Sequence, residues 1–166
     1  DGDVVGIDGV SSLDFDLYPG EYFLSVSHRN HLGVISNTTQ VLSKDEFVLD
    51  FTNGSIPAKG GINGRWEFND GALAMIAGNV SGDDKVSILG VNNDGSGLRT
   101  AILTDPSNVF GFPSFSINGY SAFDVNMNGQ ANILGASNDA SLLRSIILNA
   151  QGNIFGFPSF TFTQQF

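Results

Sequence analysis

Apolar and polar residues alternate along the first third of the chain. Leu13, Phe15 and Leu17 alternate with polar residues, and 22–26 repeats the pattern after a proline-glycine turn. Strict alternation predicts strands with one buried face. Further short strands are predicted at 3–7, 34–36, 38–42 and 46–51. About six strands at this spacing predict an immunoglobulin-like β-sandwich in residues 1–52.

Helical periodicity appears twice in the second half of the chain. Apolar residues lie four apart in the pairs Leu98/Ile102 and Leu143/Ile147, which predicts short helices at 96–103 and 141–148. Glycine-rich residues between the two halves predict a linker, followed by a packing segment with the only tryptophan, Trp66. The predicted fold is therefore mostly β with a small α part. The predicted domains are 1–52, a linker and packing segment at 53–76, and 77–166.

Residues 77–121 and 122–166 are two copies of one unit. About 19 of the 45 paired positions are identical, and Phe-Gly-Phe-Pro-Ser-Phe occurs in both copies. Such a repeat predicts two similar units that share one core. We interpret the phenylalanines as part of that core. The alternative is that they form a sugar- or protein-binding face with Trp66 and Tyr120.

Each copy begins with oxygen-bearing side chains at alternate positions. Calcium takes six to eight oxygen ligands, and a loop with ligands at positions 1, 3, 5 and 7 and a late carboxylate supplies them. The spacing therefore predicts two calcium loops. The candidate ligands are Asn79, Ser81, Asp83, the carbonyl of Lys85 and Asp94 in the first copy, and Asp124, Asn126, Asn128, the carbonyl of Gln130 and Asp139 in the second.

Both copies depart from the usual calcium loop. The late acid falls about four residues after position 12, and the first copy has Asp84 where the second has Gly129 at position 6. Asp94 and Asp139 directly precede the predicted helices, where each can cap the helix and still turn an oxygen toward an ion. The alternative is a pair of Asn/Asp-rich turns that need no ion.

These features resemble known families. The duplicated loop followed by a helix resembles a dockerin-type calcium repeat. A wider resemblance, over nearly the whole chain, is to the C-terminal region of large secreted, hemagglutinin-like surface proteins of the Bacteroidetes. It is carried by residues 1–5, the His-Arg-Asn-His-Leu-Gly string at 28–33, residues 50–52 and both loops. The resemblance implies an extracellular, secreted or cell-surface location, and it implies architecture more than activity.

Composition and charge exclude some classes of function and favour others. A net charge of −10 argues against a nucleic-acid partner, which would call for a basic face. No apolar run is long enough to cross a membrane. The chain has no cysteine, so a secreted form would need stabilisation other than disulfides, and bound calcium is one source. Because the chain starts at Asp1 without a methionine or a signal peptide, we expect it to be a C-terminal piece of a longer protein.

Two histidines are the other candidate ligands. His28 and His31 are three residues apart and could hold a metal, but no cysteine or third histidine accompanies them. We interpret them as structural residues that hydrogen-bond their loop, and we expect Arg29 to pair with an acid. No nucleophile with an adjacent base is recognisable, so we do not expect an enzyme.

The sequence thus predicts a non-catalytic, calcium-stabilised structural or adhesive module at the C-terminus of a bacterial surface protein. Its partners would be other surface-protein domains or further copies of the chain. One alternative is a filament subunit that assembles by strand addition, using an open sheet edge near Asp1 and the tail at 160–166. Another is a carbohydrate-binding module that uses Trp66. Docking to a cohesin-type receptor is a third, which the four-residue insertion disfavours.

Overall fold

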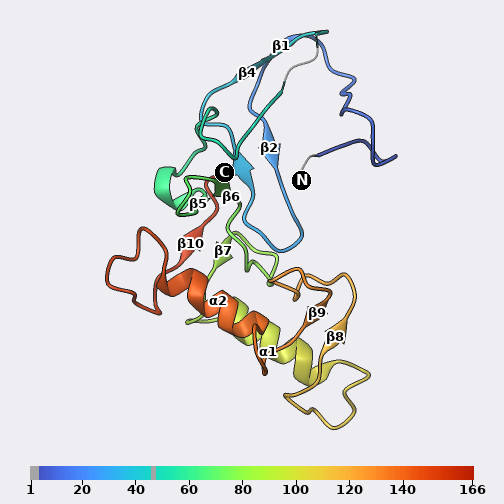
Figure 1. The fold of residues 1–166 in the computed structure, drawn as a ribbon, viewed down its shortest axis with the longest axis vertical. Coiled ribbons are helices and arrows are strands. Elements are labelled where there is room, and N and C mark those ends of the chain that lie inside the picture. The colour runs from blue at the N-terminus through green and yellow to red at the C-terminus, as the bar shows by residue number, and fades with distance from the viewer. Residues whose placement is uncertain (1–3, 46–47) are drawn as a thin grey trace.

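The computed structural model describes residues 4–45 and 48–166. A pair of packed helices lies at one end of the longest axis and a two-stranded ladder at the other (Figure 1). The described sheets are all two-stranded and antiparallel. The fold is therefore mostly short strands with two helices, which confirms the coarse prediction; the immunoglobulin-like arrangement stays a prediction.

The elements follow this order along the chain: β1 (Gly20–Tyr22), β2 (Ser25–Val26), β3 (Val34–Ile35), β4 (Gln40–Leu42), η1 (Gly61–Asn63), β5 (Trp66–Glu67), β6 (Leu73–Ala74), β7 (Lys85–Val86), α1 (Asp94–Thr104), β8 (Ile117–Asn118), β9 (Gln130–Ala131), α2 (Asp139–Leu148) and β10 (Phe162–Thr163).

The N-terminal part contains two hairpin-like pairs. β1 pairs with β4 and β2 pairs with β3. The strand predicted around 13–17 does not form, and Leu13, Phe15 and Leu17 are 46%, 57% and 52% exposed. The described residues of the strands predicted at 3–7 and 46–51 are also irregular, while residues 1–3 and 46–47 lie outside the described residues. Alternation alone does not make a strand when no neighbouring chain accepts its hydrogen bonds.

The segment predicted as a linker is packed in part. Ala58 is buried and bridged to Ser36, and η1 follows directly. β5 then pairs with β6, and Trp66 packs against the core of the repeats. Residues 53–76 therefore contact both the N-terminal part and the repeats.

The two helices begin two residues earlier than predicted. Asn93 caps α1 by accepting a hydrogen bond from the backbone N–H of Ser96, and Asn138 caps α2 in the same way. The expectation that Asp94 and Asp139 act as caps is wrong, because the asparagine before each occupies that position. Each aspartate is the first helical residue, and its carboxylate turns back into the preceding loop.

Strands of the two copies pair with each other. β7 of the first copy pairs with β10 of the second, and β9 of the second pairs with β8 of the first. Val86 lies opposite Phe162 and Ala131 opposite Ile117, which are equivalent positions under the 45-residue shift. The predicted shared core is confirmed, since it contains Val86, Leu98, Ile102, Ala131, Leu143, Ile147 and Phe162.

The aromatic segments differ from the prediction. Phe110, Phe112, Phe155 and Phe157 are 80%, 57%, 74% and 58% exposed, so their assignment to the core is wrong. Within each Phe-Gly-Phe-Pro-Ser-Phe string, only the last phenylalanine, Phe115 or Phe160, packs against the core. The two segments lie at opposite ends of the helix pair, colour-graded yellow and orange-red (Figure 1).

A buried asparagine holds each aromatic turn in shape. Asn153 donates from Nδ2 to the carbonyls of Ile147 and Phe157 and accepts at Oδ1 from the Phe157 N–H. Asn108 makes the same three bonds in the first copy. The turn's polar groups are thereby satisfied internally, so the rings need not be buried to fix its conformation.

Replacing Asn153 tests this arrangement. Asn153→Ala should lower the free energy of unfolding by about 1–3 kcal/mol, because it leaves buried backbone groups without partners. The measurement is urea unfolding followed by circular dichroism. Asn37→Ala, at an exposed site where the side chain makes no hydrogen bond to the described residues, is the control and should change stability by less than about 0.5 kcal/mol. Equal stability of the two variants would contradict a structural role for Asn153.

Candidate metal centre

Loop 2 (residues 124–139) closes around two buried carboxylates. Asp124 is 2% exposed and accepts hydrogen bonds from the backbone N–H groups of Asn128 and Gly129, at 3.1 and 2.9 Å. Gly129 has a φ of 88°, which a residue with a side chain rarely adopts, so glycine is needed for this turn. The side chain at position 1 of the loop therefore fixes the backbone at positions 5 and 6, Asn128 and Gly129.

Asp139 closes the same loop from the helix end. Its side chain is fully buried, and Oδ1 accepts from the N–H groups of Val125 and Asn126, at 2.7 and 3.1 Å. Oδ2 accepts from the N–H of Asn132 at 2.8 Å. The displaced late acid is therefore brought back to the loop despite its four-residue shift in sequence.

Loop 1 (residues 79–94) has an equivalent buried carboxylate. Asp94 is 1% exposed and accepts from the backbone N–H and hydroxyl of Ser81 and from the N–H of Ser87. Burial raises the pKa of Asp94 above its ordinary value, and the charge of Asp83 raises it further. Two acids of loop 1 are thus near enough to repel each other.

The two loops are not identical at their first positions. Asn79 is buried and donates from Nδ2 to the Asp83 carbonyl, whereas Asp124 accepts backbone N–H groups. Asp84, at position 6, does not take the positive φ that Gly129 takes, which is the departure expected from its side chain. Loop 2 is therefore closer to the usual calcium-loop geometry.

The remaining candidate ligands face outward. Ser81, Asp83, Lys85, Asn128 and Gln130 are exposed, and Asn126 is half-buried. Asn126 and Asn128 border an open pocket of about 450 Å³ between loop 2 and the start of α2.

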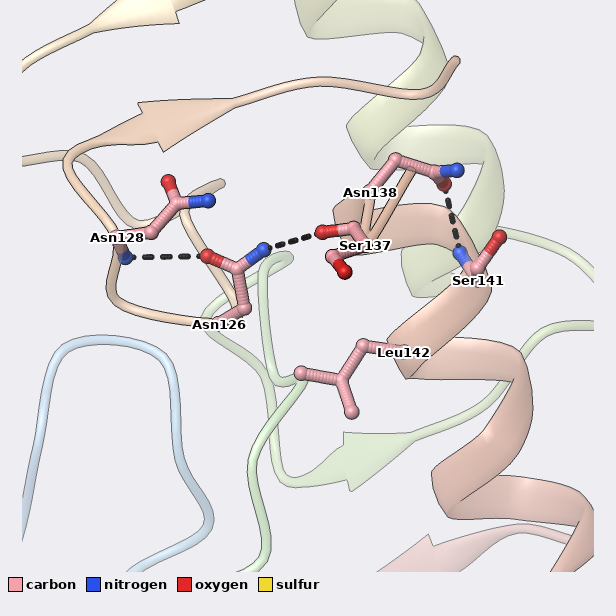
Figure 2. Close-up of a pocket in the computed structure, with 6 residues that line it drawn as sticks. All are labelled: Asn126, Asn128, Ser137, Asn138, Ser141 and Leu142. Atoms are coloured by element: carbon pink, nitrogen blue, oxygen red, sulfur yellow. Dashed lines mark hydrogen bonds between the residues drawn. The ribbon is translucent and has the colours of Figure 1, made fainter. Parts of the chain in front are cut away.

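Figure 2 shows how this pocket is held. Asn126 accepts from the Asn128 N–H at 3.0 Å and donates from Nδ2 to the Ser137 carbonyl at 2.7 Å. Asn138 accepts from the Ser141 N–H at the helix start. The side-chain amide of Asn126 therefore links the turn at Asn128 to Ser137, which lies just before α2.

The donor set fits calcium chemically. Among the candidate ligands each loop offers two carboxylates, Asp83 with Asp94 and Asp124 with Asp139, together with amide, hydroxyl and carbonyl oxygens. No group of three or more histidine or acidic side chains gathers within residues 4–45 and 48–166, so an ion would depend on the neutral oxygens for the rest of its shell. In the same ranges no basic nitrogen lies within 4.0 Å of these four carboxylates.

One further oxygen was missed by the sequence reasoning. Oδ1 of Asn132 is buried and has no hydrogen-bond partner. Asn132 occupies position 9 of loop 2, a position that serves calcium in loops of this kind, often through water. The alternate spacing that marks Asp124, Asn126 and Asn128 continues to Asn132, so the signal was available.

The His28–Leu32 segment lies against both loops. Asn30 is fully buried; its Nδ2 donates to the Asp124 carbonyl at 2.7 Å. Its carbonyl accepts from the N–H groups of Gly78 and Asn79, at 2.8 and 3.0 Å. One residue thus contacts position 1 of both loops, and nothing in the local sequence pattern indicates this.

The neighbours of Asn30 follow the prediction in part. The two histidines are within hydrogen-bonding distance of the Asn30 side chain, as expected for structural residues. Arg29 pairs with no acid among the described residues; it donates from Nε to the Ser121 carbonyl at 2.9 Å, and its guanidinium lies 3.5 Å from the Tyr120 ring centroid. Burial, followed by the charges of His28 and Arg29, lowers the pKa of His31 to about 4.

Comparisons with protein-family models, with curated proteins and with solved structures find no match for this chain. No helix in the described ranges combines the length and the apolar character needed to cross a bilayer.

Proposed function

We propose that this chain is a non-catalytic, calcium-stabilised structural and adhesive module at the C-terminal end of an extracellular bacterial surface protein. The observation that supports it is the pair of buried carboxylates, Asp94 and Asp139, that close equivalent loops without a basic partner in the described residues. A buried charge costs several kcal/mol unless it is compensated. Backbone N–H groups offset part of this cost, and a bound cation offsets more.

A dockerin-like tandem is the arrangement that we propose for residues 77–166. Two loops, each followed by a helix, are related by the 45-residue repeat and exchange strands across a shared core. The four-residue displacement of the late acid distinguishes them from the dockerin pattern. The immunoglobulin-like sandwich for residues 1–52 is the companion proposal, and β1–β4 and β2–β3 would be parts of it.

The proposed mechanism is linkage between ion binding and folding. An ion that binds only the folded loops adds about 2.7 kcal/mol of stability at a concentration one hundred times its dissociation constant. Asn30 of the N-terminal part contacts both loops, so an ion bound in the loops also holds the N-terminal part against the repeats. A module of this kind would keep a surface protein in shape where calcium is plentiful.

Thermal unfolding with excess calcium and with chelator tests the proposal. Calcium should raise the melting temperature by roughly 5–10 °C, from the stabilisation above and the usual slope for a chain of this size. The rise should shrink in Asp124→Ala/Asp139→Ala, which removes both carboxylates of loop 2. Asp14→Ala/Asp16→Ala removes the same charge at exposed sites and should keep the full rise. Equal melting temperatures in calcium and chelator would reduce the loops to Asn/Asp turns and reject the proposal.

Strand addition into a filament is a second candidate, favoured by the N-terminal segment. Several large side chains there are exposed, including Val10 at 82%, Phe15 at 57% and Tyr18 at 89%, and this stretch pairs with no strand of the described residues. A neighbouring copy could cover them by adding a strand to β1 or β4. Sedimentation velocity over a hundredfold range of concentration tests this candidate, and a constant monomer would reject it.

Carbohydrate binding is favoured by the exposed aromatic turns rather than by Trp66. Trp66 packs against the core, so it is poorly placed as a platform, whereas Phe110 and Phe155 are 80% and 74% exposed. Aromatic faces stack on sugars. Calcium-dependent retention on a polysaccharide column that is lost in Phe110→Ala/Phe155→Ala would support this function, and absence of retention would reject it.

A further inference from the structure

Three atoms that could bind a metal meet in the His28–His31 segment, which lies against the two loops. Nδ1 of His28 lies 2.8 Å from Nδ1 of His31, and the two nitrogens lie 3.0 and 2.8 Å from Oδ1 of Asn30. The histidine rings meet edge to face, with centroids 4.6 Å apart. The three atoms therefore form a nearly equilateral triangle.

Hydrogen bonds cannot satisfy all three edges of this triangle. The Asn30 amide is fixed because its Nδ2 donates to the Asp124 carbonyl, so the atom facing the histidines is an oxygen that only accepts. If both nitrogens carry protons directed at that oxygen, the edge between the nitrogens brings two N–H groups together. If one nitrogen carries none, it can accept from the other nitrogen, but its lone pair then also faces the Asn30 oxygen, which only accepts. A positive ion bound to all three lone pairs removes this conflict.

The size of the triangle indicates a coordination geometry. With metal–ligand bonds of about 2.1 Å, edges of 2.8–3.0 Å correspond to ligand–metal–ligand angles of roughly 85–90°. A tetrahedral ion would hold the same atoms about 3.4 Å apart at this bond length. The arrangement therefore matches three adjacent positions on one face of an octahedron.

We propose that His28, Asn30 and His31 form a binding site for a divalent first-row transition-metal ion such as Co²⁺, Ni²⁺ or Fe²⁺. Imidazole nitrogens suit these ions and are poor ligands for calcium, so the site is chemically distinct from the two loops.

Arg29 sets a limit on the affinity of this site. Its Nη1 lies 3.0 Å from Nε2 of His28, and because a guanidinium only donates, Nε2 accepts and the imidazole proton resides on Nδ1. Metal binding at Nδ1 moves that proton to Nε2, so Nη1 must withdraw while the bond from Nε to Ser121 can remain. The positive charge of Arg29 also repels the ion. Removing Arg29 should therefore strengthen metal binding.

The experiment is a Co²⁺ titration of the tag-free chain in excess calcium, so that the loops do not take up the cobalt. The chain has only two histidines, so the imidazole signals in NMR report on this site alone. One Co²⁺ per chain should bind, both imidazole signals should broaden or shift, and the weak visible absorption of six-coordinate cobalt should appear. Isothermal titration calorimetry gives the affinity.

Three variants decide the assignment. His28→Ala and His31→Ala should each weaken Co²⁺ binding at least tenfold, whereas Arg29→Leu should tighten it several-fold. Melting curves of the metal-free variants verify that each is folded. If a histidine variant does not fold, the affinity of Arg29→Leu for Co²⁺ still tests the proposal. Failure of both the native chain and Arg29→Leu to bind millimolar Co²⁺ would overturn the proposal, as would binding that persists in both histidine variants.

Discussion

Asn30→Ala is expected to lower the free energy of unfolding by about 2–4 kcal/mol. The side chain is fully buried, and its Nδ2 is the donor that reaches the Asp124 carbonyl. Alanine leaves that carbonyl without its partner and removes the oxygen beside the two imidazoles, which costs about 1–3 kcal/mol, and the vacated space adds to the loss. Chemical unfolding in urea, with calcium present, measures the change.

The same variant should also respond less to calcium. Asn30 contacts position 1 of both loops, so its loss loosens the backbone that would carry the ligands. The calcium-induced rise in melting temperature should therefore be smaller than in the native chain. Asn37→Ala removes an exposed asparagine side chain and is the control, with a change under about 0.5 kcal/mol. If Asn30→Ala matched this control in stability and in calcium response, the proposed coupling would be wrong.

Leu143→Ala is expected to cost about 2–5 kcal/mol, the range for truncating a fully buried leucine. Leu143 has no exposed surface, and its Cδ1 lies so close to Gly78 that a β-carbon there would be 2.5 Å away. The loss therefore opens a cavity between α2 and the segment that leads into loop 1. Differential scanning calorimetry or urea unfolding measures it.

The repeat supplies the controls for this prediction. Leu98 is the equivalent residue of the first copy and is equally buried, so Leu98→Ala should cost a similar amount. Leu134 is 56% exposed, and Leu134→Ala should change stability by under about 0.5 kcal/mol. A Leu143→Ala variant no less stable than Leu134→Ala would contradict the shared core.

Local patterns predicted the repeat module better than the N-terminal part. The i, i+4 pairs of apolar residues located both helices to within a few residues, because helical periodicity is a property of adjacent turns. The alternation of apolar and polar residues at 13–17 wrongly predicted a strand. A strand needs a partner strand, and that partner can lie anywhere in the chain.

In the candidate site, too, local spacing could be predicted from the sequence and long-range contacts could not. The spacing of Asp124, Asn126 and Asn128 defines one turn of backbone and is readable in sequence. The return of Asp139 to that turn depends on where α2 begins, and its three N–H partners are 7, 13 and 14 residues away. Asn30 is 94 residues from Asp124, and no periodicity links them.

By itself, the sequence determined the duplication, the positions of both helices, the oxygen-rich loops and the acidic, cysteine-free composition. Only the tertiary structure decided that strands of the two copies pair with each other, that Phe110, Phe112, Phe155 and Phe157 of the aromatic turns remain exposed, and that Asn30 lies between the loops with the two histidines beside it. The reason is physical: helical periodicity and turn chemistry act over a few residues. Pairing and burial depend on which distant segments meet, and that is settled by the packing of the whole chain.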